Sequence, residues 1–399
     1  MNRSDALALR GPPASEEPRG TLRSLVPPSI PPLYVEVDLD AVTANANEVQ
    51  ALVGPSCGVL AMLKADAYGH GLLPVARALE RAGSIAGIVV SSVRDALSLR
   101  RAGVTLPIIA LSCRFAGRHG RLIDTGVTPV LGGLAELEAF SSAARARGIR
   151  APAHVEIDTG MSRSGVREEE LGSFLSTLAD HPDVVISGLC TQLASADAEQ
   201  PTSAHRQLDA FERACWRFRA AGHRPTMIHA ANTAAVARLP RSHFSHVRVG
   251  IALYGGDEPS GIELQPAMRV ATRVVALRTI ARGESVGYGE TWKALRPSLI
   301  ATLPVGYAHG YPRRWQGRAE VLVRGCRCPV VGAICMEMTM VDVTDVPGVA
   351  LDDEVVLVGG CGEVEIRVTD LARTMNGIVE EFLCAVPRAA LRTYTGRST

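Results

Sequence analysis

The sequence predicts a (β/α)8 barrel followed by a C-terminal domain of mostly antiparallel β-strands. Apolar strand-like runs alternate with helix-like segments as far as Tyr254, and strands that alternate with helices pair in parallel. Beyond Tyr254 helices largely disappear, and glycine and proline turns separate short apolar runs. A doubly wound open sheet has the same alternation and is the second possibility. The eight barrel runs are residues 58–63, 87–92, 106–112, 127–131, 152–157, 184–193, 226–230 and 246–251.

The chain divides into three segments by composition. The first is rich in proline, glycine and serine, so we predict a disordered extension without a packed core. Order should begin at the strand-like run Leu33–Asp38, before a helix that Asp38 or Asp40 can cap. The predicted segments are residues 1–32 for the extension, 33–260 for the barrel and 261–399 for the β domain, with a linker at 255–261.

Helical periodicity is clearest in three segments between the barrel strands, and weakest at residues 113–126. One helix, roughly Thr369–Gly377, interrupts the β domain near its end. The three clear helices are Leu72–Ala82, Leu134–Arg147 and Ala204–Ala221. The strand-like runs of the β domain are Met268–Ile280, Leu299–Leu303, Glu320–Val323, Val330–Ile334 and Val355–Val358.

Composition excludes several classes of function. The formal net charge is +1 and there is no long basic run, which argues against a nucleic-acid surface. No apolar stretch approaches the ~20 residues of a membrane span, and the N-terminus lacks the apolar core of a secretory signal. The nine cysteines are an odd number scattered through apolar segments, which indicates reduced thiols in a cytoplasmic protein. No metal site is expected.

A lysine closes the apolar run of the first barrel strand. Lys64 follows Val59–Leu63, and the chain turns at Gly69 and Gly71 before the next helix. Burial would lower the pKa of this amine and free it to form a Schiff base with an aldehyde. The alternative is a lysine that extends from a strand end into solvent.

The segment from Lys64 to Gly71, KADAYGHG, closely resembles the pyridoxal-phosphate lysine segment of alanine racemases. The resemblance implies that Lys64 carries pyridoxal 5'-phosphate and that Tyr68 binds the phosphate of the cofactor. It also implies a fold with a barrel and a β domain, as the periodicity predicts.

The loop after the fifth barrel strand presents an arginine. Residues Asp158–Gly165 resemble the DTGM-x-R segment of alanine racemases, whose arginine helps to hold the substrate carboxylate. The resemblance therefore assigns this role to Arg163. A surface arginine in a turn is the other interpretation.

The loops after strands seven and eight commonly bind phosphate in such barrels. A hydroxyl at Thr233 and backbone amides at Gly250 and Ile251 suit that task. These segments resemble the family's HxxNS and VRxG, with threonine where serine is usual. In the family, the counterpart of Arg248 faces the pyridine nitrogen of the cofactor. A guanidinium cannot give up its proton, so that nitrogen stays unprotonated, which favours return of a proton to the substrate over transamination.

The β domain supplies a tyrosine and a methionine. Residues Val286–Trp292 resemble the family's catalytic-tyrosine segment, which implies that Tyr288 enters the partner's site in a head-to-tail homodimer. Racemisation needs bases on opposite faces, and Lys64 and Tyr288 would provide them. Residues 334–337 are similar to the family's I-x-MD, which implies that Met336 binds substrate. Residues 305–313 are similar to its GYADGYPR, and the resemblance covers about residues 33–395.

Four positions depart from the family. Glu156 stands where a lysine, often carbamylated, is usual, and its charge can still pair with Arg163. Gln192 replaces a histidine beneath the cofactor ring and cannot titrate. Glu337 replaces an aspartate of the substrate entry. Glu380 replaces a tyrosine of the phosphate site, where a carboxylate would repel phosphate, so its side chain is expected to point elsewhere.

The sequence thus predicts a pyridoxal-phosphate-dependent racemase that interconverts L- and D-alanine. A racemase of another amino acid and a catalytically weak cofactor-binding relative are the alternatives. A related barrel decarboxylase of basic amino acids is a further possibility, but the glycine-rich phosphate loop and the Cys-Asp pair of those enzymes are absent.

Overall fold

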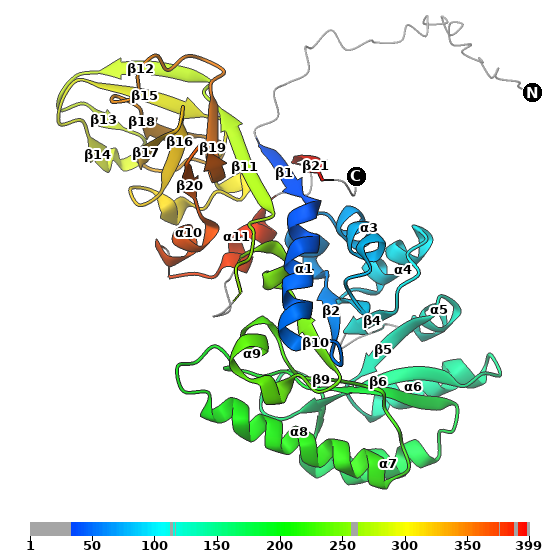
Figure 1. Ribbon diagram of the computed structural model, residues 1–399. Coiled ribbons are helices and arrows are strands. Elements are labelled where there is room, and N and C mark those ends of the chain that lie inside the picture. Colours follow the sequence, from blue (N-terminus) through cyan, green and yellow to red (C-terminus); the bar gives the residue numbers. More distant parts are fainter. Residues whose placement is uncertain are drawn as a thin grey trace, which may run out of the picture. The chain divides into compact units, whose positions relative to one another are not determined.

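The computed structural model (Figure 1) describes residues 33–111, 115, 117–256, 262–374, 376–386 and 390–396. By its contacts the chain divides into Met1–Pro31 and Pro32–Thr399, and all described residues belong to the second unit. The predicted extension at 1–32 and most of the predicted linker, residues 257–261, lie outside the described residues.

Eight parallel strands close into a barrel with helices around it (Figure 1). The pairing of Val247 in β10 with Val59 in β2 joins the last strand to the first, so the predicted barrel is confirmed and the open sheet is wrong. Each of the eight predicted runs contains or overlaps one strand. The barrel strands are β2 Gly58–Met62, β3 Gly87–Val90, β4 Ile108–Leu111, β5 Val127–Leu131, β6 Ala151–Asp158, β8 Val184–Cys190, β9 Met227–His229 and β10 His246–Val249, and the short β7 Val166–Arg167 adds to β6.

The helices of the barrel pack an apolar face on the strands. In α3, which has the predicted bounds Leu72–Ala82, the buried residues recur at helical spacing. Asp38 caps α1, since its carboxylate accepts the amides of Asp40 and Ala41. The helices are α1 Leu39–Val53, α2 Lys64–Tyr68, α3, α4 Val93–Arg101, α5 His119–Asp124, α6 Leu134–Arg145, α7 Leu171–Ala179, α8 Thr202–Ala220, α9 Thr233–Arg238, α10 Val368–Thr374 and α11 Val379–Ala385.

The β domain is built on a ten-stranded sheet in the order β12-β15-β18-β17-β16-β19-β11-β1-β21, with β20 beside β19. The helix predicted at 369–377 is α10, and a second short helix, α11, follows it. A separate hairpin joins β13 and β14. The strands are β1 Tyr34–Asp38, β11 Met268–Arg273, β12 Ala276–Ile280, β13 Ser285–Val286, β14 Trp292–Lys293, β15 Ser298–Leu303, β16 Glu320–Val323, β17 Cys326–Val331, β18 Thr339–Asp342, β19 Glu354–Cys361, β20 Val364–Ile366 and β21 Leu391–Thr395.

The strand that precedes the barrel in sequence belongs to the sheet of the β domain. β1 pairs antiparallel with β11 and parallel with β21, so both ends of the described chain meet in this sheet. The predicted division of the chain at residue 260 stays a prediction. Among the described helices none is long and apolar enough to cross a membrane, and the eight described cysteines are unpaired.

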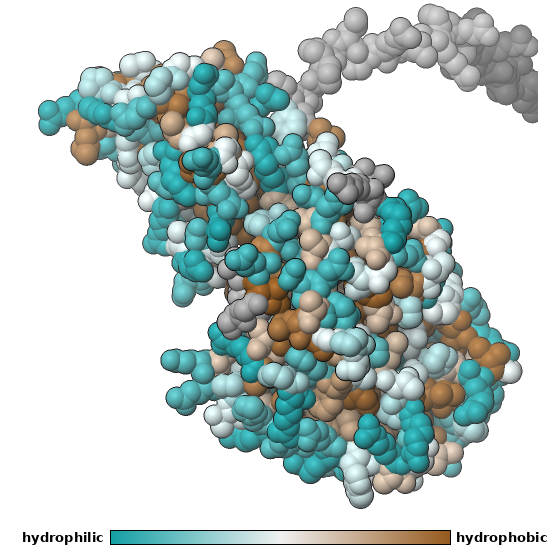
Figure 2. Space-filling view, viewed as in Figure 1, coloured by the Kyte–Doolittle hydropathy of each residue, from teal (hydrophilic) through white to brown (hydrophobic). Residues whose placement is uncertain are grey.

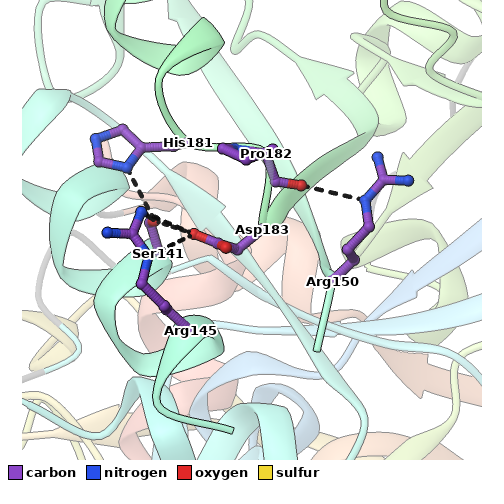
Figure 3. Close-up of polar contacts among 6 residues, drawn as sticks. All are labelled: Ser141, Arg145, Arg150, His181, Pro182 and Asp183. Atoms are coloured by element: carbon purple, nitrogen blue, oxygen red, sulfur yellow. Dashed lines mark hydrogen bonds and ion pairs between the residues drawn. The ribbon is translucent and has the colours of Figure 1, made fainter. Parts of the chain in front are cut away.

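Charged and polar side chains cover most of the face shown in Figure 2. One cluster at the amino end of β8 fastens α6 to the barrel (Figure 3). The buried Ser141 hydroxyl donates to Asp183 at 2.8 Å and lies 2.9 Å from His181 Nδ1, and Arg145 also donates to Asp183. Because the serine proton goes to the carboxylate and not to the imidazole, this group is a structural anchor and not a nucleophile with its base.

Candidate active site

A cavity of about 390 Å³ opens at the carboxyl ends of the barrel strands, where enzymes of this fold carry their chemistry. It brings together three of the predicted residues, Lys64, Arg163 and Arg248. They come from the start of α2, the loop after β6, and β10, which are far apart in the sequence. The remaining lining residues are Met62, Ser91, Leu111, Glu156, Ser164, Cys190, Thr191 and Gln192.

Lys64 stands at the end of β2, at the start of a left-handed turn. The φ angles of Ala65, Asp66, Ala67 and Tyr68 are 53°, 59°, 55° and 53°. A left-handed helical residue costs roughly 1–2 kcal/mol, so four in succession need support from their surroundings. The lysine side chain is exposed, so the expectation of a buried lysine is wrong. The chain has only two lysines, which leaves Lys293 of β14 as the other possible amine nucleophile.

Arg248 is buried and its guanidinium is fixed by four hydrogen bonds. Its Nη1 donates to the Nδ1 and the carbonyl oxygen of His229, each at 2.8 Å. Its Nη2 donates to the Thr191 carbonyl at 2.9 Å and to the Gln192 side-chain oxygen at 3.2 Å. Burial lowers the pKa of the guanidinium, which nevertheless stays charged because arginine starts from a very high value.

These contacts also fix the protonation of two buried histidines. Arginine can only donate, so His229 Nδ1 must accept, and its proton is on Nε2. That proton is donated to His154 Nδ1, 3.0 Å away. The pKa of both rings is lowered, mainly by burial, and the pKa of His154 falls to about 3. Both imidazoles are therefore neutral. A directed chain of hydrogen bonds therefore holds Arg248 from behind.

The residues predicted to bind the cofactor phosphate lie close together beside the cavity. Thr233 begins α9, and its hydroxyl accepts the amides of Gly250 and Ala252 at 3.4 Å each. A Cβ atom added to Gly250 would lie 2.3 Å from the Tyr68 hydroxyl, so this hydroxyl lies against the glycine. Ile251 follows at the start of a buried 3-10 turn, Ile251–Tyr254.

Arg163 and Glu156 both face the cavity, but they form no ion pair. The Glu156 carboxylate accepts the Ser164 hydroxyl at 2.6 Å. The expectation that Glu156 fixes Arg163 by a direct charge pair is therefore wrong for this structure. Glu156 interacts favourably with the charge of Arg248, whose pKa it raises against the larger effect of burial.

The structure shows the surroundings of two other residues that depart from the family pattern, Gln192 and Glu380. Gln192 turns its side-chain oxygen toward Arg248, the only orientation in which the amide can accept from a guanidinium. Glu380 lies on α11, and after burial its carboxylate is the next cause that raises the pKa of Tyr68. The Glu380 carboxylate therefore acts on Tyr68 electrostatically, and the direction of its side chain stays a prediction.

Tyr288 and Met336 do not line the cavity of their own chain. Both lie on loops of the β domain, and their side chains are 72% and 57% exposed. The Tyr307 amide donates to the Cys335 carbonyl at 3.2 Å, so the Met336 loop is fastened to that of Tyr307, which is also exposed. An exposed aromatic and apolar surface of this kind is typical of a protein interface.

The sequence did not point to several residues of the site. Thr191 and Ser164 line the cavity, whereas His154 contacts His229, which in turn accepts from Arg248. His154 lies two positions before Glu156 on the same strand, and residues so spaced share a face. That spacing could have identified it, whereas no local pattern marks Ser164.

Two family models match most of the chain. The model for "Alanine racemase, N-terminal domain" matches residues 37–258, and that for "Alanine racemase, C-terminal domain" matches residues 267–394. An alanine racemase from Sorangium cellulosum is 42% identical over 344 residues, which cover 84% of this chain and 90% of that protein.

Solved structures agree in fold over nearly the same length. Alanine racemase from the D-cycloserine producer Streptomyces lavendulae has a TM-score of 0.87 at 31% identity, and covers 91% of this chain and 97% of its own. Alanine racemase from Bartonella henselae with covalently bound pyridoxal phosphate has a TM-score of 0.82 at 28% identity, covering 91% and 99%.

Proposed function

The chain belongs to the alanine racemase family, and we propose that it interconverts L- and D-alanine with pyridoxal 5'-phosphate as cofactor. The observation that carries the proposal is the cavity that joins Lys64, Arg163 and Arg248 at the carboxyl ends of the strands. In it an amine can bind an aldehyde, and two guanidinium groups can meet a carboxylate and a ring nitrogen.

The group around Gly250 fits the phosphate of such a cofactor. The Tyr68 and Thr233 hydroxyls and the amides of Gly250 and Ile251 would donate to phosphate oxygens, and a side chain at 250 would fill the space beside Tyr68. We propose that these residues hold the phosphate and that Lys64 binds the aldehyde. When bound, the cofactor supplies an electron sink that acidifies the α-carbon of the amino acid.

Two side chains of the protein would move the proton. One base removes the α-proton from one face, and the conjugate acid of the other returns a proton to the opposite face, so the configuration inverts and the atoms balance. We assign these roles to the Lys64 amine and the Tyr288 phenol. Arg163, from the loop after β6, would hold the substrate carboxylate, and Met336 would contact the substrate from the β domain.

Arg248 would keep its own protons, so the pyridine nitrogen of the cofactor would receive none from it. Its guanidinium donates hydrogen bonds to His229, Thr191 and Gln192, and these bonds hold it in one position. Because a guanidinium cannot give up its proton, the ring nitrogen would stay unprotonated, and a neutral ring withdraws fewer electrons from the α-carbon, which favours return of the proton to that carbon.

We further propose a homodimer with shared sites. Tyr288 is 72% exposed and absent from the cavity of its own chain, which supports a site that Tyr288 of a second chain completes. The cytoplasmic location inferred from the cysteines remains a prediction.

Racemisation is tested by incubating holoprotein with L-alanine and a panel of other L-amino acids, followed by chiral chromatography. In deuterated water, D-alanine should appear with deuterium at the α-carbon, and Lys64→Ala protein should form none. Failure to form D-alanine would refute the proposal. Faster racemisation of another amino acid would assign a different substrate.

The shared site is tested by mixing inactive Lys64→Ala and Tyr288→Phe proteins under conditions of subunit exchange. Half of the dimers should be hybrids, and one of the two sites in each hybrid has both bases. Activity should therefore recover to about one quarter of wild type for a two-fold dimer. Each variant mixed with a tagged copy of itself is the control. Absence of recovery after proven exchange would place both bases in one chain.

A further inference from the structure

The left-handed turn that carries Lys64 is held from outside by the C-terminal end of the chain. The Gly69 carbonyl, one residue beyond the turn, accepts the Arg392 Nε at 3.0 Å. A Cβ at Gly69 would lie 2.2 Å from the Leu383 carbonyl oxygen, and a Cβ at Gly71 would lie 2.1 Å from the Tyr394 hydroxyl. Both glycines therefore allow α11 and β21 to approach the turn directly.

Arg392 is suited to hold the turn because it is itself fixed. Its side chain is 8% exposed, and its Nη2 lies 4.0 Å from Oδ2 of Asp66, which is in the turn. The other oxygen of Asp66 accepts the Leu72 amide at 2.9 Å, so the carboxylate connects the turn to α3. On the other side, Arg392 stands opposite Val35 in the parallel pairing of β21 with β1.

We propose that Arg392 is a positioning residue for Lys64. The turn adopts a backbone conformation that its residues do not favour, and its own backbone hydrogen bonds connect only residues within 63–71. Arg392 ties this turn to the large sheet of the β domain, 323 residues away in the chain. The proposal rests on the proposed function of Lys64, because a base must be aimed at the α-carbon to act on it.

The test compares three variants of the full-length holoenzyme. Arg392→Met keeps the apolar stem and removes the donors, and Arg392→Lys keeps a charged donor. Thr393→Ala is the matched control, since Thr393 is the next residue of β21 and is exposed. The measurements are hydrogen–deuterium exchange of peptides spanning 63–72, the kcat and KM for racemisation, and the midpoint of thermal unfolding.

Arg392→Met should speed exchange in this segment and lower kcat by about tenfold or more, with a smaller effect on KM. Arg392→Lys should recover part of kcat, because an ammonium can still donate to a carbonyl. If Arg392→Met does not fold, Arg392→Gln, which retains a polar tip, should show the same pattern. Unchanged exchange with wild-type kcat would overturn the proposal, as would equal losses in Thr393→Ala.

The exchange measurement also separates this proposal from the proposed function. If the wild type does not racemise alanine, the proposed function fails, and faster exchange in Arg392→Met still supports the contact between Arg392 and the turn. If the wild type is active and the Arg392 variants keep both its kcat and its exchange, only the positioning role is refuted.

Discussion

The stability of the protein should fall at mildly acidic pH because of His70, two residues beyond Tyr68. This ring is fully buried, and its Nδ1 lies 3.1 Å and 3.0 Å from the carbonyl oxygens of Ala67 and Tyr68. Nδ1 must therefore carry the proton. Nε2 is buried without a hydrogen-bond partner among the described residues, so a second proton would place a charge in the interior. Burial is the main cause that lowers the pKa of His70 to about 4.

The sign and size of the effect follow from linkage. The folded pKa lies below the unfolded value of about 6.5, so the stabilisation is complete above that value and is lost as pH falls toward the folded pKa. Between about pH 7.5 and about pH 4.5, this one group should reduce the free energy of unfolding by about 2.5 kcal/mol.

The assay is urea unfolding at both pH values, at one protein concentration, for wild type and His70→Phe. The phenyl ring can keep the contact with Tyr254, on which His70 is stacked at 4.3 Å between ring centroids. His70→Phe should be less stable at neutral pH, because two carbonyls lose a donor, but its stability should decline less on acidification. His154 and His229 remain in both proteins, so their contributions cancel in the comparison. An equal decline in the two proteins would refute the assignment.

Three other predictions concern the site and the anchor at β8. Gly250→Ala should weaken cofactor binding measured by fluorescence titration, because the new methyl would lie 2.3 Å from the Tyr68 hydroxyl; unchanged affinity would contradict the proposed phosphate site. Glu156→Gln should raise the KM for the amino acid with little change in thermal unfolding, since a neutral amide accepts the Ser164 hydroxyl more weakly and holds the loop of Arg163 less firmly; unchanged kinetics would show that this contact does not act on substrate binding. Ser141→Ala should lower the unfolding midpoint at pH 7. The hydroxyl of Ser141 helps to hold the pKa of the Asp183 carboxyl below its usual value of about 3.9. The difference in unfolding midpoint between wild type and Ser141→Ala should therefore shrink as pH falls below that value. A difference that does not change with pH would exclude the carboxylate as the partner of Ser141.

The sequence by itself determined which elements form and which family they belong to. The eight barrel strands and the bounds of α3 follow from apolar periodicity, because a strand or a helix buries one face with a fixed spacing. Lys64, Arg163 and Arg248 could be expected to meet, since the carboxyl ends of barrel strands lie at one rim. The motif KADAYGHG and its companions then gave the family, which the matches over residues 37–258 and 267–394 establish.

Only the tertiary structure decided how the site residues are held. Glu156 contacts Ser164 and not Arg163, and Lys64 is exposed, because side-chain partners depend on loop geometry that no spacing encodes. The membership of β1 in the C-terminal sheet and the bond from Arg392 to Gly69 join residues that are hundreds of positions apart. Apolar periodicity shows which face of a helix or strand is buried, but not which other element covers that face. Contacts between residues so far apart in the sequence therefore form only when the whole chain has folded.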